Sequence, residues 1–224
     1  MNNRRFHEID HLTIKLWVGI IAILLPWVLA IVASCVLQSV SESYWSGDWP
    51  RNIFVGSLIA IAALVSAYNG EGPMDMIMAR IAAVSAVSAA FLPSDPHKIL
   101  WPRCHATLHY VAGGLLFLIL TYFCMAFFRK ARAKTTREAK RRMMIYLLCA
   151  AAIVGAMAIL LVDTVMVMLL HNDWINDHFP VLFFYAEATA LMAFGVSWLT
   201  ASHVLPYLNA PEERYRVDIL RRRR

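Results

Sequence analysis

Long runs of apolar residues alternate with short polar segments along the whole chain. The runs are too long for strands in a protein core, and several approach or exceed the ~20 residues with which an α-helix crosses a bilayer. Backbone polar groups in lipid must be satisfied within the segment, and the two-residue alternation of a membrane barrel is missing, so the runs predict helices. We expect an all-α integral membrane bundle, one domain with six transmembrane helices at about 14–38, 53–69, 75–92, 105–128, 143–170 and 179–203.

Composition and charge agree with a membrane protein. Hydrophobic residues make up 60% of the 224 positions and charged residues 16%, against roughly a quarter charged in soluble proteins. The net charge is +6, and 17 of the 21 Lys and Arg lie in the N-terminal segment, the 129–142 loop and the tail at 204–224. This positive-inside pattern predicts that both termini and the tail are cytoplasmic. The clustering also argues against nucleic acid as a partner.

Ionisable residues inside the predicted helices need a reason, because they are costly in lipid and usually face the bundle interior. We expect a structural role for Arg80 and Asp75, which lie near a cytoplasmic helix end, where Arg80 can pair with Asp75 or reach toward the cytoplasm. At ~1.5 Å per residue, His109 lies roughly 9 Å, Glu187 roughly 10 Å and Asp163 roughly 12 Å from the outer ends of three other helices. We therefore expect these three side chains at one level.

Two further histidines extend this set. His105 and His109 are four residues apart and point to the same side of a helix, while His171 continues a polar stripe that begins at Asp163. Imidazole and carboxylate groups are ordinary zinc ligands. One interpretation is an outward-open pocket that holds zinc through His105, His109 and His171, with Asp163 as a further ligand or acid–base group. Glu187 would then be the general base of a metal-assisted hydrolase that cleaves a lipid amide or ester.

The same residues allow two other interpretations. The polar groups can serve packing in a non-enzymatic complex subunit or assembly factor, or they can move protons in a small transporter. A partner surface would then be formed by the interfacial aromatic residues, namely Tyr44, Trp45, Trp49, Trp101 and Trp174. A haem is disfavoured, because no other helix carries a histidine as deep as His109. The His-Glu-x-x-His motif of zinc proteases is also missing from the sequence.

Several segments carry a family resemblance, among them "RNIFVG" from Arg51, "LHYVAGGLLFLIL" around His109 and "EATALMAFGVSWL" from Glu187. The chain from about Ser39 to Leu199 resembles an uncharacterised family of bacterial multi-pass membrane proteins. This resemblance implies a location in the bacterial inner membrane, and it implies that His109 and Glu187 are the functionally important pair of polar residues. It implies no activity. At a looser level the architecture resembles the alkaline ceramidase and adiponectin receptor superfamily of zinc-dependent lipid amidases. The motifs of that superfamily do not align here, so we carry over no residues from it.

Overall fold

The computed structural model describes residues 11–70, 72–92, 103–170 and 174–209, and these residues form helices and connecting segments without strands. The elements are α1 (His11–Val32), η1 (Ser41–Tyr44), α2 (Asp48–Ser66), α3 (Pro73–Phe91), α4 (Arg103–Arg132), α5 (Arg137–Leu170), α6 (Trp174–His178), α7 (Leu182–Ala201) and η2 (Pro206–Leu208). Within these ranges, six helices are long and apolar enough to cross a membrane, namely all the α-helices except α6. The all-α class and the six predicted spans are confirmed.

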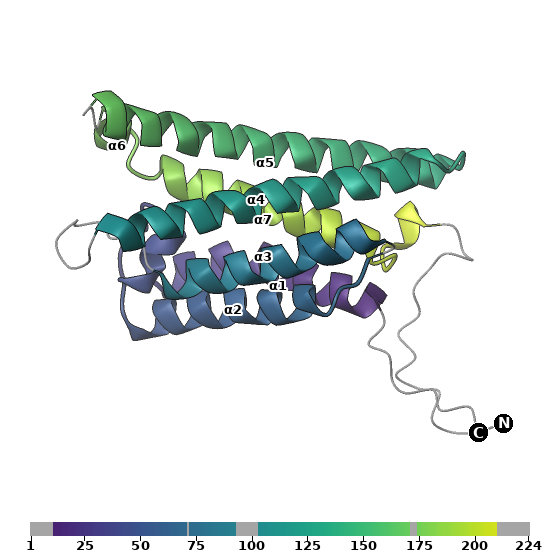
Figure 1. Cartoon of the computed structure of the whole chain (residues 1–224), viewed down its shortest axis with the longest axis horizontal. Coiled ribbons are helices and arrows are strands. Elements are labelled where there is room, and N and C mark those ends of the chain that lie inside the picture. Colours follow the sequence, from purple (N-terminus) through teal and green to yellow (C-terminus); the bar gives the residue numbers. More distant parts are fainter. Residues whose placement is uncertain (1–10, 71, 93–102, 171–173, 210–224) are drawn as a thin grey trace, which may run out of the picture.

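The six long helices run side by side, with α5 and α2 on opposite sides of the bundle (Figure 1). They form a closed ring in which α1, α2, α3, α4 and α5 pack in chain order and α7 packs against both α5 and α1. We call the end where α1 begins and α7 ends the terminal end, and the end where α1 ends and α7 begins the far end. Which side of a membrane each end faces stays a prediction.

Two glycines bring α1 and α7 into direct backbone contact. A Cβ atom on Gly195 would lie 2.8 Å from the carbonyl oxygen of Gly19, and a Cβ on Gly19 would lie 2.9 Å from the carbonyl oxygen of Gly195. Small residues allow such close approach between helices in lipid. The Ala-rich helix α3 follows the same rule, because most of the residues that it buries are alanines.

The predicted helix boundaries differ from the observed ones in two places, the end of the first helix and the basic 129–142 region. The prediction that the first helix continues to residue 38 is wrong, because α1 ends at Val32 and the next segment crosses to α7 without regular structure. Both α4 and α5 extend into the basic 129–142 region, to Arg132 and from Arg137. Hydropathy alone does not predict these additional helical turns of α4 and α5, because a helix can continue beyond the apolar layer once its backbone hydrogen bonds are formed.

Candidate functional site

Of the predicted site residues, His109 and Glu187 lie toward the far end of the bundle, and an irregular segment covers part of this end. This segment, residues 33–47, joins α1 to α2 and includes η1. It is fixed to the beginning of α7, where the backbone N–H of Phe184 donates to the carbonyl oxygen of Gln38 over 2.7 Å. Phe184 lies in the first turn of α7, where an N–H has no partner inside the helix, so this bond satisfies a group that the helix leaves open.

Glu187 holds the same segment from α7. Its Oε2 atom accepts the backbone N–H groups of Val40 at 2.7 Å and of Ser41 at 3.2 Å. Val40 and Ser41 are buried and lie at the beginning of η1, where N–H groups also lack helical partners. A carboxylate is a strong acceptor for such groups. Glu187 therefore acts as a clamp on the backbone of the irregular segment.

Other side chains satisfy the rest of this segment. The hydroxyl of Ser43 donates to the carbonyl oxygen of Val40 over 2.5 Å, and the carboxylate of Glu42 accepts the backbone N–H of Gln38. From α2, Arg51 donates through Nε to the carbonyl oxygen of Tyr44 over 2.8 Å, and its guanidinium carbon lies 5.0 Å from the centre of the Tyr44 ring. The segment is thus held by α2 as well as by α7.

His109 is buried on α4 and closes a different helix end. Its Nδ1 atom lies 2.5 Å from the carbonyl oxygen of Leu92, the residue that follows the last turn of α3. A carbonyl oxygen only accepts, so Nδ1 carries the hydrogen and Nε2 is the acceptor nitrogen of the neutral ring. His109 therefore ties α4 to the end of α3, whereas Glu187 ties α7 to the segment after α1.

The remaining predicted site residues are only partly described. Asp163 is half-buried on α5, but the side chains of His105 and His171 lie outside the described residues. Among the side chains that the structure describes, no group of three His, Cys, Asp or Glu residues could hold a metal ion. The zinc site at His105, His109 and His171 and the catalytic roles of Asp163 and Glu187 stay predictions.

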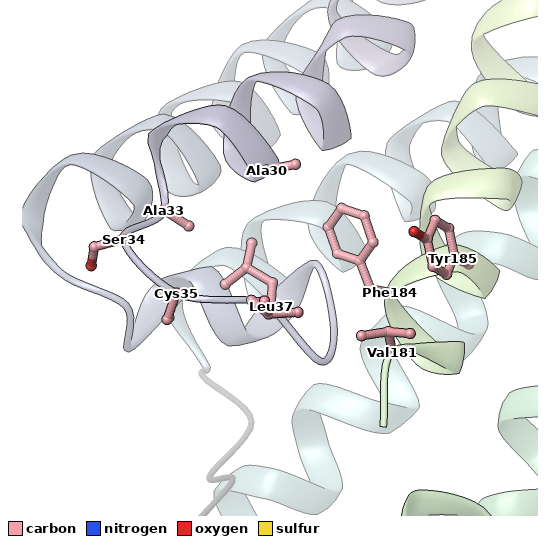
Figure 2. A pocket seen from close by; sticks show the side chains of 9 residues that line it. Ala30, Ala33, Ser34, Cys35, Leu37, Val181, Phe184 and Tyr185 are labelled. Carbon is pink, nitrogen blue, oxygen red and sulfur yellow. The ribbon is translucent and has the colours of Figure 1, made fainter. Parts of the chain in front are cut away.

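A groove opens beside the Glu187 clamp, between the end of α1 and the beginning of α7 (Figure 2). Its volume is about 450 Å³, within the roughly 300–1,000 Å³ that is typical of small-ligand sites. The groove is lined by Ala30, Ala33, Ser34, Cys35, Val36, Leu37, Val181, Phe184 and Tyr185. Cys35 is an exposed free thiol. The lining is mostly apolar, so the groove suits an apolar ligand better than a hydrolytic water.

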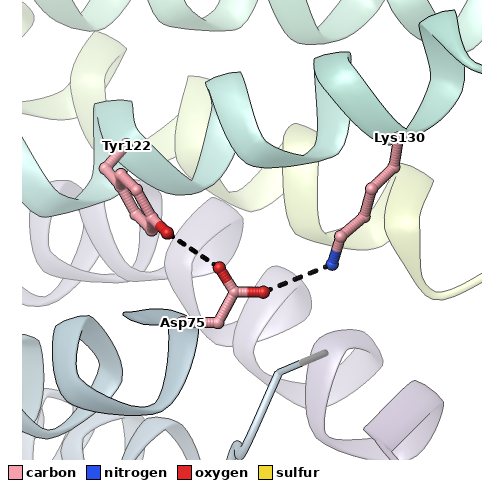
Figure 3. Close-up of polar contacts among 3 residues, drawn as sticks. All are labelled: Asp75, Tyr122 and Lys130. Atoms are coloured by element: carbon pink, nitrogen blue, oxygen red, sulfur yellow. Dashed lines mark hydrogen bonds and ion pairs between the residues drawn. The ribbon is translucent and has the colours of Figure 1, made fainter. Parts of the chain in front are cut away.

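The terminal end carries a second polar cluster, which the sequence reasoning did not single out as a site. Asp75 is buried at the beginning of α3 and accepts the Tyr122 hydroxyl at 2.9 Å (Figure 3). Its other oxygen lies 3.4 Å from the Lys130 ammonium. Arg80 is exposed on the same helix. The structural role expected for Asp75 is supported, and the structure places Lys130 against it, while the exposed position of Arg80 agrees with the expectation that its side chain reaches toward the helix end.

Aromatic rings fill the bundle beneath this cluster. Tyr68, Phe123 and Phe127 each lie within 6.0 Å, centre to centre, of the fully buried Trp198 ring. The Lys15 ammonium lies 5.2 Å from the centre of the Phe127 ring and 5.4 Å from that of Tyr68, in the range of cation–π contacts. This aromatic cluster could have been expected from the sequence, because aromatic residues recur near those helix ends that adjoin the basic segments.

Comparisons with known proteins give no relative from which a function could be inferred. No protein-family model matches the sequence, no curated protein matches it, and no solved structure matches the fold. The resemblance to an uncharacterised bacterial membrane protein family therefore stays a prediction. The function has to be inferred from the geometry of the two ends.

Proposed function

We propose that this protein is a non-enzymatic multi-pass protein of the bacterial inner membrane, a complex subunit or scaffold whose far end faces the periplasm. The observation that carries the proposal is the way Glu187 is used. Its Oε2 atom accepts the backbone N–H groups of Val40 and Ser41, so the carboxylate has a structural task. A general base would need to reach a water molecule or a substrate.

The second predicted key residue supports the same proposal. His109 donates from Nδ1 to the carbonyl oxygen of Leu92, at the end of α3. Together, Glu187 and His109 satisfy backbone groups at two places where helices end within the bundle. Such groups are costly when they are left unpaired in an apolar environment, and this is a sufficient reason for an acid and an imidazole at this depth.

The charge distribution supports the orientation. The α4–α5 connection at the terminal end carries a dense run of basic residues, namely Arg129, Lys130, Arg132, Lys134, Arg137, Lys140, Arg141 and Arg142. Loops with such a Lys and Arg excess remain on the cytoplasmic side during insertion. With the terminal end inside, the segment 33–47 and the groove belong to the periplasmic half.

The experiment compares stability, metal content and lipid turnover in purified protein. We expect no near-equimolar zinc, no cleavage of lipid esters or amides above that of empty vesicles, and lower thermal stability for Glu187→Gln and His109→Phe. Asp177→Asn, which changes an exposed carboxylate on α6, is the matched control and should leave stability unchanged. A stoichiometric zinc ion, together with lipid cleavage that Glu187→Gln abolishes without changing thermal stability, would establish the metal-assisted hydrolase instead.

A further inference from the structure

The groove at the far end follows from the way α1 and α7 cross. The two helices touch through Gly19 and Gly195, which leave no room for a Cβ atom on either side. Packed helices cross at an angle and are closest at one point, so they separate away from it. Ala30 and Phe184 each lie about eleven residues, roughly 16 Å along the helix, from these glycines. The groove therefore results from the helix crossing and is a fixed feature of the fold.

One wall of the groove is non-helical backbone that is held rigidly. Residues 33–37 form this wall, and the chain beyond it is fixed by the bond from Phe184 to Gln38 and by the Glu187 clamp. The wall is thus anchored on both sides, by the end of α1 and by the bonds of Gln38 and Val40 to α7, and this limits how far it can move.

The groove is continuous with the lipid-facing surface of the bundle. Ile31 and Val36, beside the groove on the α1 side, are 82% and 78% exposed, and Tyr185 on the α7 side is 61% exposed. The ligand thus enters from the bilayer. The side chains that line the groove are apolar apart from the hydroxyls of Ser34 and Tyr185 and the thiol of Cys35, and the polar surface comes mainly from these groups and the backbone of residues 33–37.

The shape of the groove selects the kind of apolar ligand. On α7 it spans only Val181–Tyr185, little more than one helical turn. A partner helix with side chains is about 10–12 Å wide and needs a longer contact along its axis. A single flexible hydrocarbon chain is narrower than a helix and needs no longer contact than this.

We propose that this groove binds one acyl chain of a phospholipid from the leaflet that surrounds the far end. The chain lies between Ala30 and Phe184 and against Leu37, and the headgroup remains at the surface near Cys35. This inference rests on the proposed function in one respect, because the lipid is a bound ligand and is not cleaved. It adds a chemically defined ligand to a protein otherwise described as a subunit or scaffold.

The experiment uses the full chain in phosphatidylethanolamine–phosphatidylglycerol vesicles that contain a phospholipid with a diazirine in one acyl chain. Illumination should attach this lipid mainly to peptides that contain residues 30–37 and 181–185. In Ala30→Trp, whose indole fills the groove, we expect at least about tenfold less attachment at these peptides, the factor that corresponds to about 1.4 kcal/mol. The matched control is Ile31→Trp, which adds the same ring at a neighbouring position that does not line the groove.

Each outcome decides between named alternatives. Equal attachment in Ala30→Trp and Ile31→Trp, or attachment spread over all lipid-facing helices, would overturn the inference and leave the proposed function standing. Attachment at these peptides that falls as the protein-to-lipid ratio is raised would identify a second copy of the chain as the occupant and also overturn it. Attached lipid that has lost its headgroup or an ester would contradict the proposed function. If Ala30→Trp does not fold, Ala33→Trp with Val32→Trp as its control replaces the pair.

Discussion

The two ends of the bundle use polar side chains in opposite ways. At the far end, Glu187 and His109 bind backbone groups of irregular or terminating segments. At the terminal end, Asp75 binds two other side chains, the Tyr122 hydroxyl and the Lys130 ammonium. Arg142 also bonds to the Asn209 side chain and lies 3.4 Å from Nδ1 of His203.

The difference follows from how the chain connects its helices. The far end contains a long connection, 33–47, which enters the bundle and exposes N–H and C=O groups that need partners. The terminal end has a short connection between α2 and α3 and a helical hairpin between α4 and α5. In the segment after α7, backbone carbonyl groups are bonded by side chains close in sequence, Ser202 to Leu199 and Asn209 to Leu205. The many cations at this end also need partners. A polar residue in a membrane helix can therefore indicate a nearby irregular backbone segment, and it does not by itself indicate a catalytic or transport site.

Removal of the Glu187 clamp should give the largest effect on stability. Glu187→Ala leaves two buried N–H groups without their acceptor, which we expect to lower the free energy of unfolding by about 2–5 kcal/mol. Glu187→Gln keeps one amide oxygen as acceptor and should lose roughly half as much. Unfolding in mixed detergent micelles measures both, with Asp177→Ala as the exposed far-end control. Equal stability of Glu187→Ala and wild type would show that the segment 33–47 does not depend on this carboxylate.

The second prediction concerns backbone shape at the terminal end. Gly70 has a φ of +63°, and a Cβ atom there would lie 2.1 Å from Cβ of Asp75. Gly70→Ala should therefore destabilise the protein by about 2 kcal/mol or more, through strain and displacement of Asp75. Gly72→Ala is the matched control, because its backbone is extended and no atom lies within 4 Å of a Cβ there. Similar melting temperatures for the two variants would rule out a rigid turn against Asp75.

A smaller effect is expected at His109. His109→Phe keeps a ring of similar size but removes the donor to the carbonyl oxygen of Leu92, which should cost about 1–3 kcal/mol, toward the lower value if water reaches the carbonyl. Amide hydrogen exchange should rise selectively in the last turn of α3. Leu108→Phe, on the exposed side of α4, should change neither quantity. Unchanged exchange at the end of α3 in His109→Phe would argue that this bond does not hold the helix end.

The smallest predicted effect tests the terminal-end cluster. Asp75→Ala and Tyr122→Phe, combined in a double-mutant cycle, should give a coupling energy of about 0.5–1.5 kcal/mol, because each substitution removes the hydrogen bond that the two side chains share. Lys130 is partly exposed, so its ion pair with Asp75 should add less than this and weaken with salt. Strict additivity of the two substitutions would mean that the cluster does not act as a unit.

The sequence predicted the spans well and the local contacts poorly. Each long apolar run became a helix, because lipid leaves the backbone no alternative. The error at the end of the first helix arose because residues 33–37 contain no charge and no proline that would mark a helix end. The groups that hold the following backbone, Phe184 at Gln38 and Glu187 at Val40, lie almost 150 positions away in the chain, and no local pattern reports them.

The candidate site shows the same division. The depth estimate selected His109 and Glu187 as unusual, and both do carry specific hydrogen bonds. The estimate assumed that side chains at one level contact each other. In the structure, His109 bonds to the backbone at the end of α3, and Glu187 bonds to the backbone of the segment after α1. Sequence spacing gives height along a helix, but the direction of a side chain across the bundle depends on how its helix is rotated against its neighbours.

By itself, the sequence determined that this chain forms six apolar helices with basic residues concentrated at one end, because hydrophobicity and charge act residue by residue. Only the tertiary structure decided that α1 and α7 cross at Gly19 and Gly195, that a groove opens beyond that crossing, and that Glu187 binds backbone. Those features depend on helix rotation and crossing angle. Both are set by side-chain packing between segments that are distant in the chain.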